Sequence, residues 1–148
     1  MEQLIQMLRV LLSDTVVLKF KAHGYHWNVE GVDFNQYHEF FEDIYTDYDS
    51  AIDTLAEWIR KLGDYAPYKL SRFAAFSDLP ETDVTSDPVA MAADLLIAND
   101  SVGAKFVDTF DMATTLRQQA LANFLAERQD MHQRWHWMLS AVIKPEAE

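Results

Sequence analysis

The sequence predicts an all-α protein, a bundle of four long helices with a short extra helix in the connection between the second and third. Two observations predict this fold class. Apolar residues recur at steps of three and four along four long segments, which is the period of helices with one buried face. A glycine-containing turn and a connection with two prolines, from Gly63 to Asp87, separate these segments.

The first helix is expected from about Gln3 to about Trp27, because no proline interrupts this segment. Its length of about 37 Å matches that of the second helix, and the short turn between them makes the pair antiparallel. The expected buried surface of the first helix comprises Leu4, Leu8, Leu11, Leu12, Val16, Leu18 and Phe20.

The second helix is expected from about Phe34 to about Leu62. Asp33 stands at the N-cap position, where its carboxylate can accept hydrogen bonds from the first free amides. Gly63 stands just past the end, as a C-terminal glycine does. The apolar positions are Phe34, Tyr37, Phe40, Phe41, Ile44, Tyr45, Tyr48, Ile52, Leu55, Ile59 and Leu62.

The long connection after the second helix needs structure of its own, and its apolar spacing predicts a short helix within Tyr68–Phe76. Asp87 as N-cap and Pro88 at the first helical position open the third helix, which runs to about Met112. Gly103 inside it marks close helix packing. Its apolar positions are Val89, Ala93, Leu96, Ile97, Val102, Phe106, Val107 and Phe110.

The fourth helix is expected from about Arg117 to about Ile143, before Pro145. His132 and His136 are four residues apart on it, which suits a metal site, but the neighbouring tryptophans favour packing. Its buried stripe is expected to comprise Leu121, Phe124, Leu125, Met131, Trp135, Leu139 and Val142.

The second helix carries two polar pairs at helical spacing. His38 and Glu42 are four residues apart, and Asp53 and Glu57 repeat that spacing. The pairs lie on nearly one face, but about 22 Å apart along the axis. Since a metal–ligand bond is only about 2 Å long, both pairs could reach one metal only if a second copy ran antiparallel across a two-fold axis.

His26 ends the first helix, and the chain reversal could return it beside His38. Two imidazoles and three carboxylates without thiolate suit iron(II), manganese or zinc. The Glu-x-x-His pattern of sites inside a bundle is absent, which also favours a site between subunits. The alternatives are that the carboxylates form a solvated face, that His26 packs beside Trp27, and that His23 packs or faces solvent.

The residues that carry this pattern resemble the Dps family of mini-ferritins, the DNA-binding proteins of starved cells. The matching stretches are His26-Trp27-Asn28-Val29, Gly31, Asp33-Phe34, His38-Glu39 and Asp53-Thr54-Leu55-Ala56-Glu57. The resemblance extends over most of the chain, more weakly in the last helices. Many members have an aspartate at the position of Glu42, and either residue supplies a carboxylate.

The resemblance implies a ferritin-like fold that assembles into a hollow homododecamer. Iron(II) is then oxidised at ferroxidase sites on the two-fold interfaces, usually by hydrogen peroxide, and ferric iron is stored inside, which protects against oxidative damage. His26, His38 and Glu42 would come from one subunit and Asp53 and Glu57 from its partner. In the family the position of Trp27 lies close to the iron site, where the ring could be oxidised.

Composition limits the other possibilities. The 148 residues suit one domain, residues 1–148. The absence of cysteine excludes disulfides and thiolate sites. No apolar run is long enough to span a bilayer, and the N-terminus lacks signal-peptide features, so a cytoplasmic location without membrane attachment is expected. The net charge of −12 disfavours binding to nucleic acid and to anionic membranes, and it is compatible with the attraction of cations.

Two departures from the family pattern matter. Alignment puts Gln118 and Asn123 where many members carry pore-lining aspartates, so Glu127 and Asp130 are the nearest candidate pore acids, with Asp108 and Asp111 as alternatives. A lysine-rich tail is also missing, since the first basic residue is Arg9 and the chain ends Pro-Glu-Ala-Glu. Phosphate binding needs clustered basic residues, so tight DNA binding is not expected.

Three functions therefore follow as hypotheses. The leading one is a ferroxidase that uses iron as substrate and stores it. The second is a structural nucleoid protein that protects DNA and keeps a vestigial metal site, which the missing basic tail disfavours. The third is a metal-free helical interaction module, which the five-residue ligand pattern disfavours.

Overall fold

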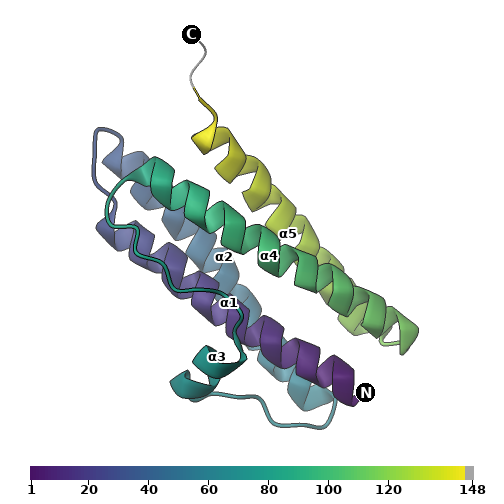
Figure 1. Cartoon of the computed structure of the whole chain (residues 1–148). Coiled ribbons are helices and arrows are strands. Elements are labelled where there is room, and N and C mark those ends of the chain that lie inside the picture. Colours follow the sequence, from purple (N-terminus) through teal and green to yellow (C-terminus); the bar gives the residue numbers. More distant parts are fainter. Residues whose placement is uncertain (146–148) are drawn as a thin grey trace.

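A computed structural model describes residues 1–145, and this part of the chain contains five helices and no strand (Figure 1). The bounds agree with the expected ones to within about three residues. Residues 146–148, the last three of the acidic C-terminal sequence Pro-Glu-Ala-Glu, lie outside the described range. The helices are α1 (Glu2–Asn28), α2 (Phe34–Lys61), α3 (Leu70–Phe76), α4 (Pro88–Thr115) and α5 (Gln119–Ile143).

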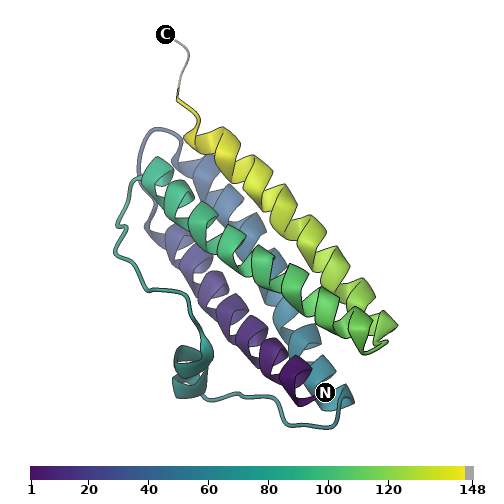
Figure 2. The same cartoon turned by 45° about the vertical axis from the view of Figure 1, so that its right-hand side comes forward.

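The four long helices form two antiparallel hairpins, α1–α2 and α4–α5, that pack against each other (Figures 1 and 2). The connection after α2 passes through α3 and then runs back along α1, so α4 begins at the end of the bundle where α2 began. The amide of Glu30 donates to the carbonyl of Ser86 at 3.0 Å, which ties this end of the connection to the α1–α2 turn.

Local sequence signals account for most of the helix ends. Gly31 in the α1–α2 turn has φ +132° and Gly63 after α2 has φ +97°, conformations that favour glycine. Asp87 accepts a hydrogen bond from the Ala90 amide at 2.8 Å, which confirms it as the N-cap of α4. Asp33 does precede α2, but the expected cap hydrogen bond is wrong: with ψ 34° its backbone is outside the extended region that such caps use.

The core lies between the long helices and is filled by leucines from all four of them, with aromatic side chains from α2 and α4. Fully buried side chains include Leu4, Leu8, Leu11, Leu18, Phe41, Ile44, Tyr48, Leu55, Ile59, Met91, Leu95, Phe106, Leu125 and Leu139. Gly103 lies against His132. A Cβ atom added to Gly103 would be 3.4 Å from the Cβ of His132, which confirms the expected close helix packing. No helix within residues 1–145 has the length and apolar character needed to cross a bilayer.

The expected buried stripe of α4 is partly wrong. Val89, Ile97 and Val107 are exposed, Ile97 to 73%, whereas Met91 and Leu95 are among the residues that fill the core. The reason is that α4 is apolar on several sides, so steps of three and four fit more than one helix face. Phe20, expected to be buried on α1, is also exposed.

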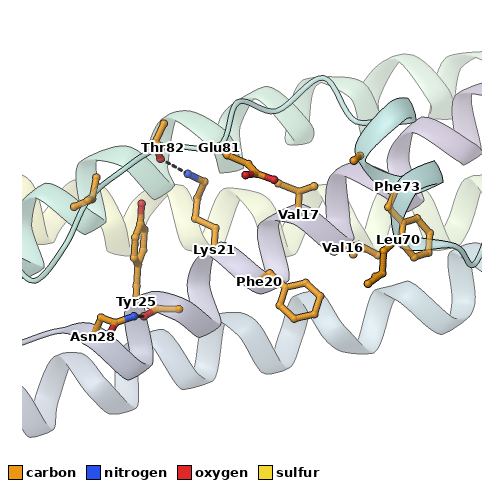
Figure 3. Close-up of a pocket in the computed structure, with 13 residues that line it drawn as sticks. Val16, Val17, Phe20, Lys21, Tyr25, Asn28, Leu70, Phe73, Glu81 and Thr82 are labelled. Atoms are coloured by element: carbon orange, nitrogen blue, oxygen red, sulfur yellow. Dashed lines mark hydrogen bonds between the residues drawn. The ribbon is translucent and has the colours of Figure 1, made fainter.

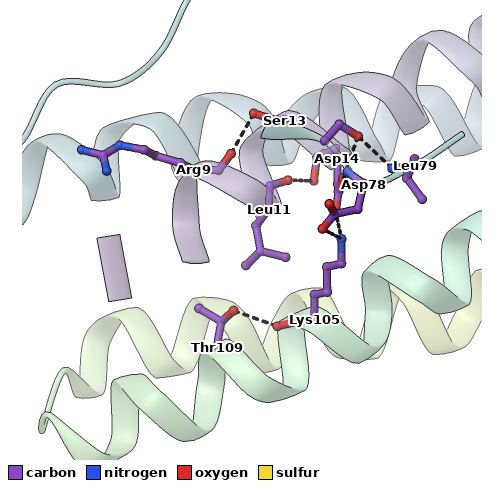
Figure 4. Close-up of polar contacts among 10 residues, drawn as sticks. Arg9, Leu11, Ser13, Asp14, Asp78, Leu79, Lys105 and Thr109 are labelled. Carbon is purple, nitrogen blue, oxygen red and sulfur yellow. Dashed lines mark hydrogen bonds and ion pairs between the residues drawn. The ribbon is translucent and has the colours of Figure 1, made fainter. Parts of the chain in front are cut away.

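A buried carboxylate fixes the connection to the bundle (Figure 4). Asp14 of α1 is fully buried and accepts hydrogen bonds from the Ser77 hydroxyl at 2.7 Å, the Asp78 amide at 3.0 Å and the Lys105 ammonium at 2.6 Å. Burial lowers the pKa of Lys105, but its hydrogen bonds to Asp14 and Asp78 outweigh burial and raise it. Asp14 therefore joins α1, the connection and α4 at one point.

A second carboxylate, that of Asp94, holds the connection at a point closer to the start of α4. Asp94 of α4 accepts hydrogen bonds from Lys21 at 2.6 Å, from Thr82 at 2.9 Å and from the Tyr25 hydroxyl. Burial raises the pKa of Asp94, but these three donors outweigh burial and lower it. The connection is thus held to α1 at two points between α3 and α4, at residues 77–78 and at Thr82.

Candidate metal centre

His26 and His38 meet where α1 ends and α2 begins. The Nδ1 of each imidazole lies 2.6 Å from the backbone carbonyl oxygen of the other residue. The two rings stack with their centroids 3.7 Å apart and an interplanar angle of 14°. The expectation that the chain reversal returns His26 beside His38 is therefore correct.

These hydrogen bonds determine which nitrogen of each ring is free. A carbonyl oxygen can only accept, so the Nδ1 of each histidine must carry the proton and donate it. In the neutral imidazole, the Nε2 of each ring then keeps its lone pair. Hydrogen bonds of this kind through the second ring nitrogen are typical of metal-ligating histidines, because they fix the tautomer and the ring orientation. Both histidines thus present an orientated Nε2 as a ligand atom.

The three candidate carboxylates lie on α2 and are exposed. Glu42, Asp53 and Glu57 form no ion pair with a lysine or arginine within residues 1–145, and their side chains belong to the uncovered side of an amphipathic helix. No group of three or more His, Asp or Glu residues in the described chain could hold a metal ion by itself. One chain therefore brings together the two histidines but not the complete ligand set.

Aromatic rings surround the histidine pair. Tyr45 lies edge-on to His26, with centroids 5.3 Å apart, and stacks on His23 at 3.9 Å. Trp27 contacts His23 at 4.2 Å and is 59% exposed, so it is not part of the core. The expectation that His23 packs is confirmed. Burial is the main cause that lowers its pKa, and Lys19 and His26 add to the effect.

Comparison with known proteins identifies the family. Residues 5–146 match the ferritin-like domain family. A DNA protection during starvation (Dps) protein from Brevibacillus brevis is 30% identical over 145 residues, which covers 94% of this chain and 96% of that protein. This chain belongs to the Dps family.

Solved structures of similar proteins have the same fold. Antigen TpF1 from Treponema pallidum (strain Nichols) is 29% identical over 140 residues, covering 94% of this chain and 79% of that protein. Its crystal structure superposes with a TM-score of 0.93 at 27% identity, over 97% of this chain and 93% of that one. The Dps protein of Vibrio cholerae O1, described as a member of a broad superfamily of ferritin-like diiron-carboxylate proteins, gives 0.91 at 26% identity, over 97% and 90% of the chains.

The second histidine pair of this Dps chain, His132 and His136, belongs to no group of three or more His, Asp or Glu residues in the described part that could hold a metal ion. His132 is buried and its Nδ1–H donates to the Asn99 carbonyl at 3.3 Å, which confirms the packing interpretation. Burial, with the nearby Arg128 charge, lowers the pKa of His132 to about 3. His136 is exposed and pairs with Asp100 at 2.8 Å, an acidic partner that the sequence analysis did not find.

The candidate pore acids of the Dps chain, Glu127 and Asp130, are exposed on α5. The Asn123 amide lies 3.5 Å from the Glu127 carboxylate. A three-fold pore would belong to an assembly of several chains, so their role stays a prediction.

A pocket of about 500 Å³ was not expected from the sequence (Figure 3). It lies between α1, α3 and the connection. Its walls include the exposed side chains of Phe20 and Leu70 and the partly buried ring of Phe73, with Tyr25 and Thr82 at its polar end. The pocket does not include His26 or His38. Sequence periodicity could not predict it, because it depends on where the connection crosses α1.

Proposed function

We propose that this Dps chain is a ferroxidase: it oxidises iron(II), with hydrogen peroxide as the oxidant, and stores the ferric product inside a hollow shell of twelve copies. The observation that carries this proposal is the His26–His38 pair, whose reciprocal hydrogen bonds leave two orientated Nε2 atoms, with the carboxylate of Glu42 one helical turn beyond His38. Imidazole nitrogen and carboxylate oxygen together suit iron(II).

The carboxylates would come from two chains. Glu42 is one turn beyond His38 and completes the half-site of one chain, whereas the centre of the Asp53–Glu57 pair is roughly 22 Å along α2 from the centre of the His38–Glu42 pair. A second α2 that runs antiparallel across a two-fold axis would bring its Asp53 and Glu57 to that half-site, and the symmetry would create two identical sites per dimer. The exposed, uncovered side of α2 supports this arrangement.

Exposed apolar side chains support assembly into a larger particle. Phe20 and Leu70 beside the pocket, Ile97 on α4 and Trp137 on α5 are each more than half exposed in one chain. Of these, Phe20 and Leu70 line the same pocket, and a contiguous apolar patch on a single chain is typical of a face that another subunit covers. A closed shell would bury several such faces at once.

Each part of the site has its own role in this proposal. The two imidazoles and Glu42 hold iron(II), the substrate, in a fixed position, and the partner's carboxylates offset the positive charge that increases when iron(II) becomes iron(III). Two iron(II) ions supply the two electrons that hydrogen peroxide needs to give two molecules of water, so no hydroxyl radical is released. Acidic residues on the inner surface would then bind the ferric product.

DNA protection in this proposal is indirect. The relative from Brevibacillus brevis is named for DNA protection, but a chain with net charge −12 gains little from phosphate contacts. Removal of iron(II) and peroxide would protect DNA without binding it.

The test compares iron(II) oxidation by peroxide in the wild type and in Asp53→Ala/Glu57→Ala. Oxidation should be lost in the double variant, and iron should co-migrate with a shell-sized particle only in the wild type. Glu39→Ala/Asp43→Ala is the matched control, because it removes the same charge from α2 where the helix faces α5. Equal slow oxidation in all three proteins would overturn the proposal.

A mixing experiment tests whether the site is shared. His26→Ala/His38→Ala and Asp53→Ala/Glu57→Ala should each be inactive alone. A mixed dimer would have one site with all five residues intact and one that keeps only Glu42, so random co-assembly should restore about a quarter of the wild-type activity. A site made within one chain would give no activity in the mixture.

A further inference from the structure

Two cations lie at the C-terminal end of α2, one turn beyond the candidate carboxylates. Arg60 and Lys61 follow Glu57 by three and four residues, which places them on the same exposed side of the helix. Within residues 1–145, neither cation forms an ion pair with a carboxylate. The positive end of this exposed side is therefore not neutralised by the described part of its own chain.

Contacts with neighbouring rings hold both cations near the end of the helix. The Arg60 guanidinium lies over the Tyr65 ring at 4.3 Å and donates a hydrogen bond to the Asp64 carbonyl at 3.1 Å. The Lys61 ammonium lies over the Trp58 ring at 4.3 Å. These contacts orient the two side chains, and both keep further N–H donors for an anion.

An acid lies at the opposite end of the same helix. Asp33 precedes α2 and is exposed, and its carboxylate does not accept the cap hydrogen bond that an acid at this position commonly accepts. The ion pairs of residues 1–145 do not include Asp33 either. Each end of α2 therefore carries charge that the described chain does not use.

The proposed shared site fixes how two α2 helices would lie. It brings His38 near the partner's Glu57, and Glu42 near the partner's Asp53. Both pairs are centred on the midpoint of α2, whose bounds are Phe34 and Lys61. The two antiparallel helices would therefore overlap along their whole length, and the end of each would lie beside the start of the other.

We propose that Arg60 and Lys61 of each chain bind the partner's Asp33, and that these ion pairs align the two α2 helices. The inference rests on the proposed ferroxidase function, which supplies the alignment. On that alignment Lys61 lies opposite the partner's Phe34, next to the partner's Asp33, and two-fold symmetry makes the contact twice per dimer. The first amides of a helix carry partial positive charge, so the two cations would be repelled there without this carboxylate.

The alignment matters because the site tolerates little displacement. A slip by one helical turn moves α2 by about 5.4 Å, whereas a metal–ligand bond is only about 2 Å long. Such a slip in one direction would also bring Arg60 and Lys61 opposite the partner's His38, where their charge would repel iron(II). Both cations are therefore positioning residues and not ligands.

Reversal of charge tests the contact without iron, by sedimentation velocity of the full-length protein. Arg60→Glu/Lys61→Glu replaces attraction by repulsion and should raise the dissociation constant of the two-fold contact at least about tenfold. Asp33→Lys should have the same effect, and all three substitutions in one chain should restore assembly. Arg134→Glu/Lys144→Glu reverses the same number of exposed charges on α5 and should assemble like the wild type. Wild-type assembly of Arg60→Glu/Lys61→Glu would overturn the inference.

Cross-linking tests the alignment directly, because the natural chain has no cysteine. A chain with Asp33→Cys is mixed with a chain with Lys61→Cys and treated with a short bis-maleimide, and the mixture should give a cross-linked dimer. Neither chain alone should do so, since the two copies of either position would lie roughly 40 Å apart along the paired helices. A mixture that gives no cross-linked dimer would overturn the inference.

Failure of this inference can be told apart from failure of the proposed function. Asp53→Ala/Glu57→Ala should assemble like the wild type, because the ion pairs are intact, and should lose only iron oxidation. Wild-type oxidation in Arg60→Glu/Lys61→Glu would overturn the role of the cations and leave the ferroxidase intact. Charge-dependent assembly in a wild type that oxidises no iron would overturn the ferroxidase and leave the contact between chains.

Discussion

His26 and His38 hold each other through two hydrogen bonds of 2.6 Å, each from an imidazole Nδ1–H to the other residue's backbone carbonyl. The same contacts therefore close the α1–α2 turn and fix the orientation of both rings. In the proposed ferroxidase, a site arranged in this way would need little rearrangement when iron(II) binds, which would favour fast binding.

Substitution of His38 can separate these two roles. The side-chain amide of Asn can donate the hydrogen bond that the imidazole Nδ1–H donates to the His26 carbonyl. It has no ligand atom at the position of Nε2. His38→Asn should therefore keep wild-type thermal stability and lose iron(II) affinity in a calorimetric titration. His38→Ala should lose affinity and also about 1 kcal/mol of stability, because the His26 carbonyl loses its donor. Wild-type iron affinity in His38→Asn would argue against His38 as a ligand.

The Asp14 contacts predict a large difference between two neighbouring carboxylates. Asp14→Asn leaves Lys105 partly buried without its main partner and should cost about 3 kcal/mol of unfolding free energy. Asp78 bonds the same Lys105 at 3.0 Å but is largely exposed, so Asp78→Asn should cost less than about 1 kcal/mol. Chemical denaturation measures both, and limited proteolysis should cut residues 77–87 faster only in Asp14→Asn. Equal losses in the two variants would contradict this account.

The features of the fold and of the candidate site that the sequence could predict are those set by residues close together in the chain. Helix ends follow from neighbouring residues, so Asp87, Pro88 and Gly63 marked them correctly. The closeness of His26 and His38 followed from a short turn. The exposure of Ile97 could not be predicted, because α4 is apolar on more than one side and only its packing selects the buried face.

Contacts between residues far apart in sequence were also beyond prediction. Arg128 of α5 donates two hydrogen bonds to Asp47 of α2, at 2.8 and 2.9 Å, and nothing in either local sequence indicates the other. The reciprocal hydrogen bonds of His26 and His38 were missed for a similar reason, since spacing predicts proximity but not the direction of a ring. The complete ligand set stays a prediction, because one chain cannot assemble it.

Buried His132 predicts a pH dependence of stability in mildly acidic solution. Its pKa is lowered to about 3 in the folded state, against about 6.5 in an unfolded chain. The unfolded state therefore takes up a proton that the folded state refuses, so stability is full above about pH 6.5 and falls as the pH decreases toward 3. At pH 4.5 the loss from this residue should be roughly 2–3 kcal/mol.

Urea denaturation at pH 7 and pH 4.5 checks this prediction. In His132→Leu this position cannot take up a proton. The free energy of unfolding of this variant should therefore fall by roughly 2–3 kcal/mol less than that of the wild type between pH 7 and pH 4.5. Loss of stability by equal amounts in the wild type and in His132→Leu would show that His132 does not cause the acid sensitivity.

The position of the long connection also has a consequence for the order of folding. Each hairpin joins helices that are neighbours in the chain, whereas contact between α1 and α4 requires the whole connection to close as a loop. Local contacts form faster than distant ones, so the α1–α2 hairpin should form before α4–α5 docks onto it. All five candidate ligands lie between residues 26 and 57, which places both half-sites of each chain within one hairpin, where they can form before the two hairpins dock.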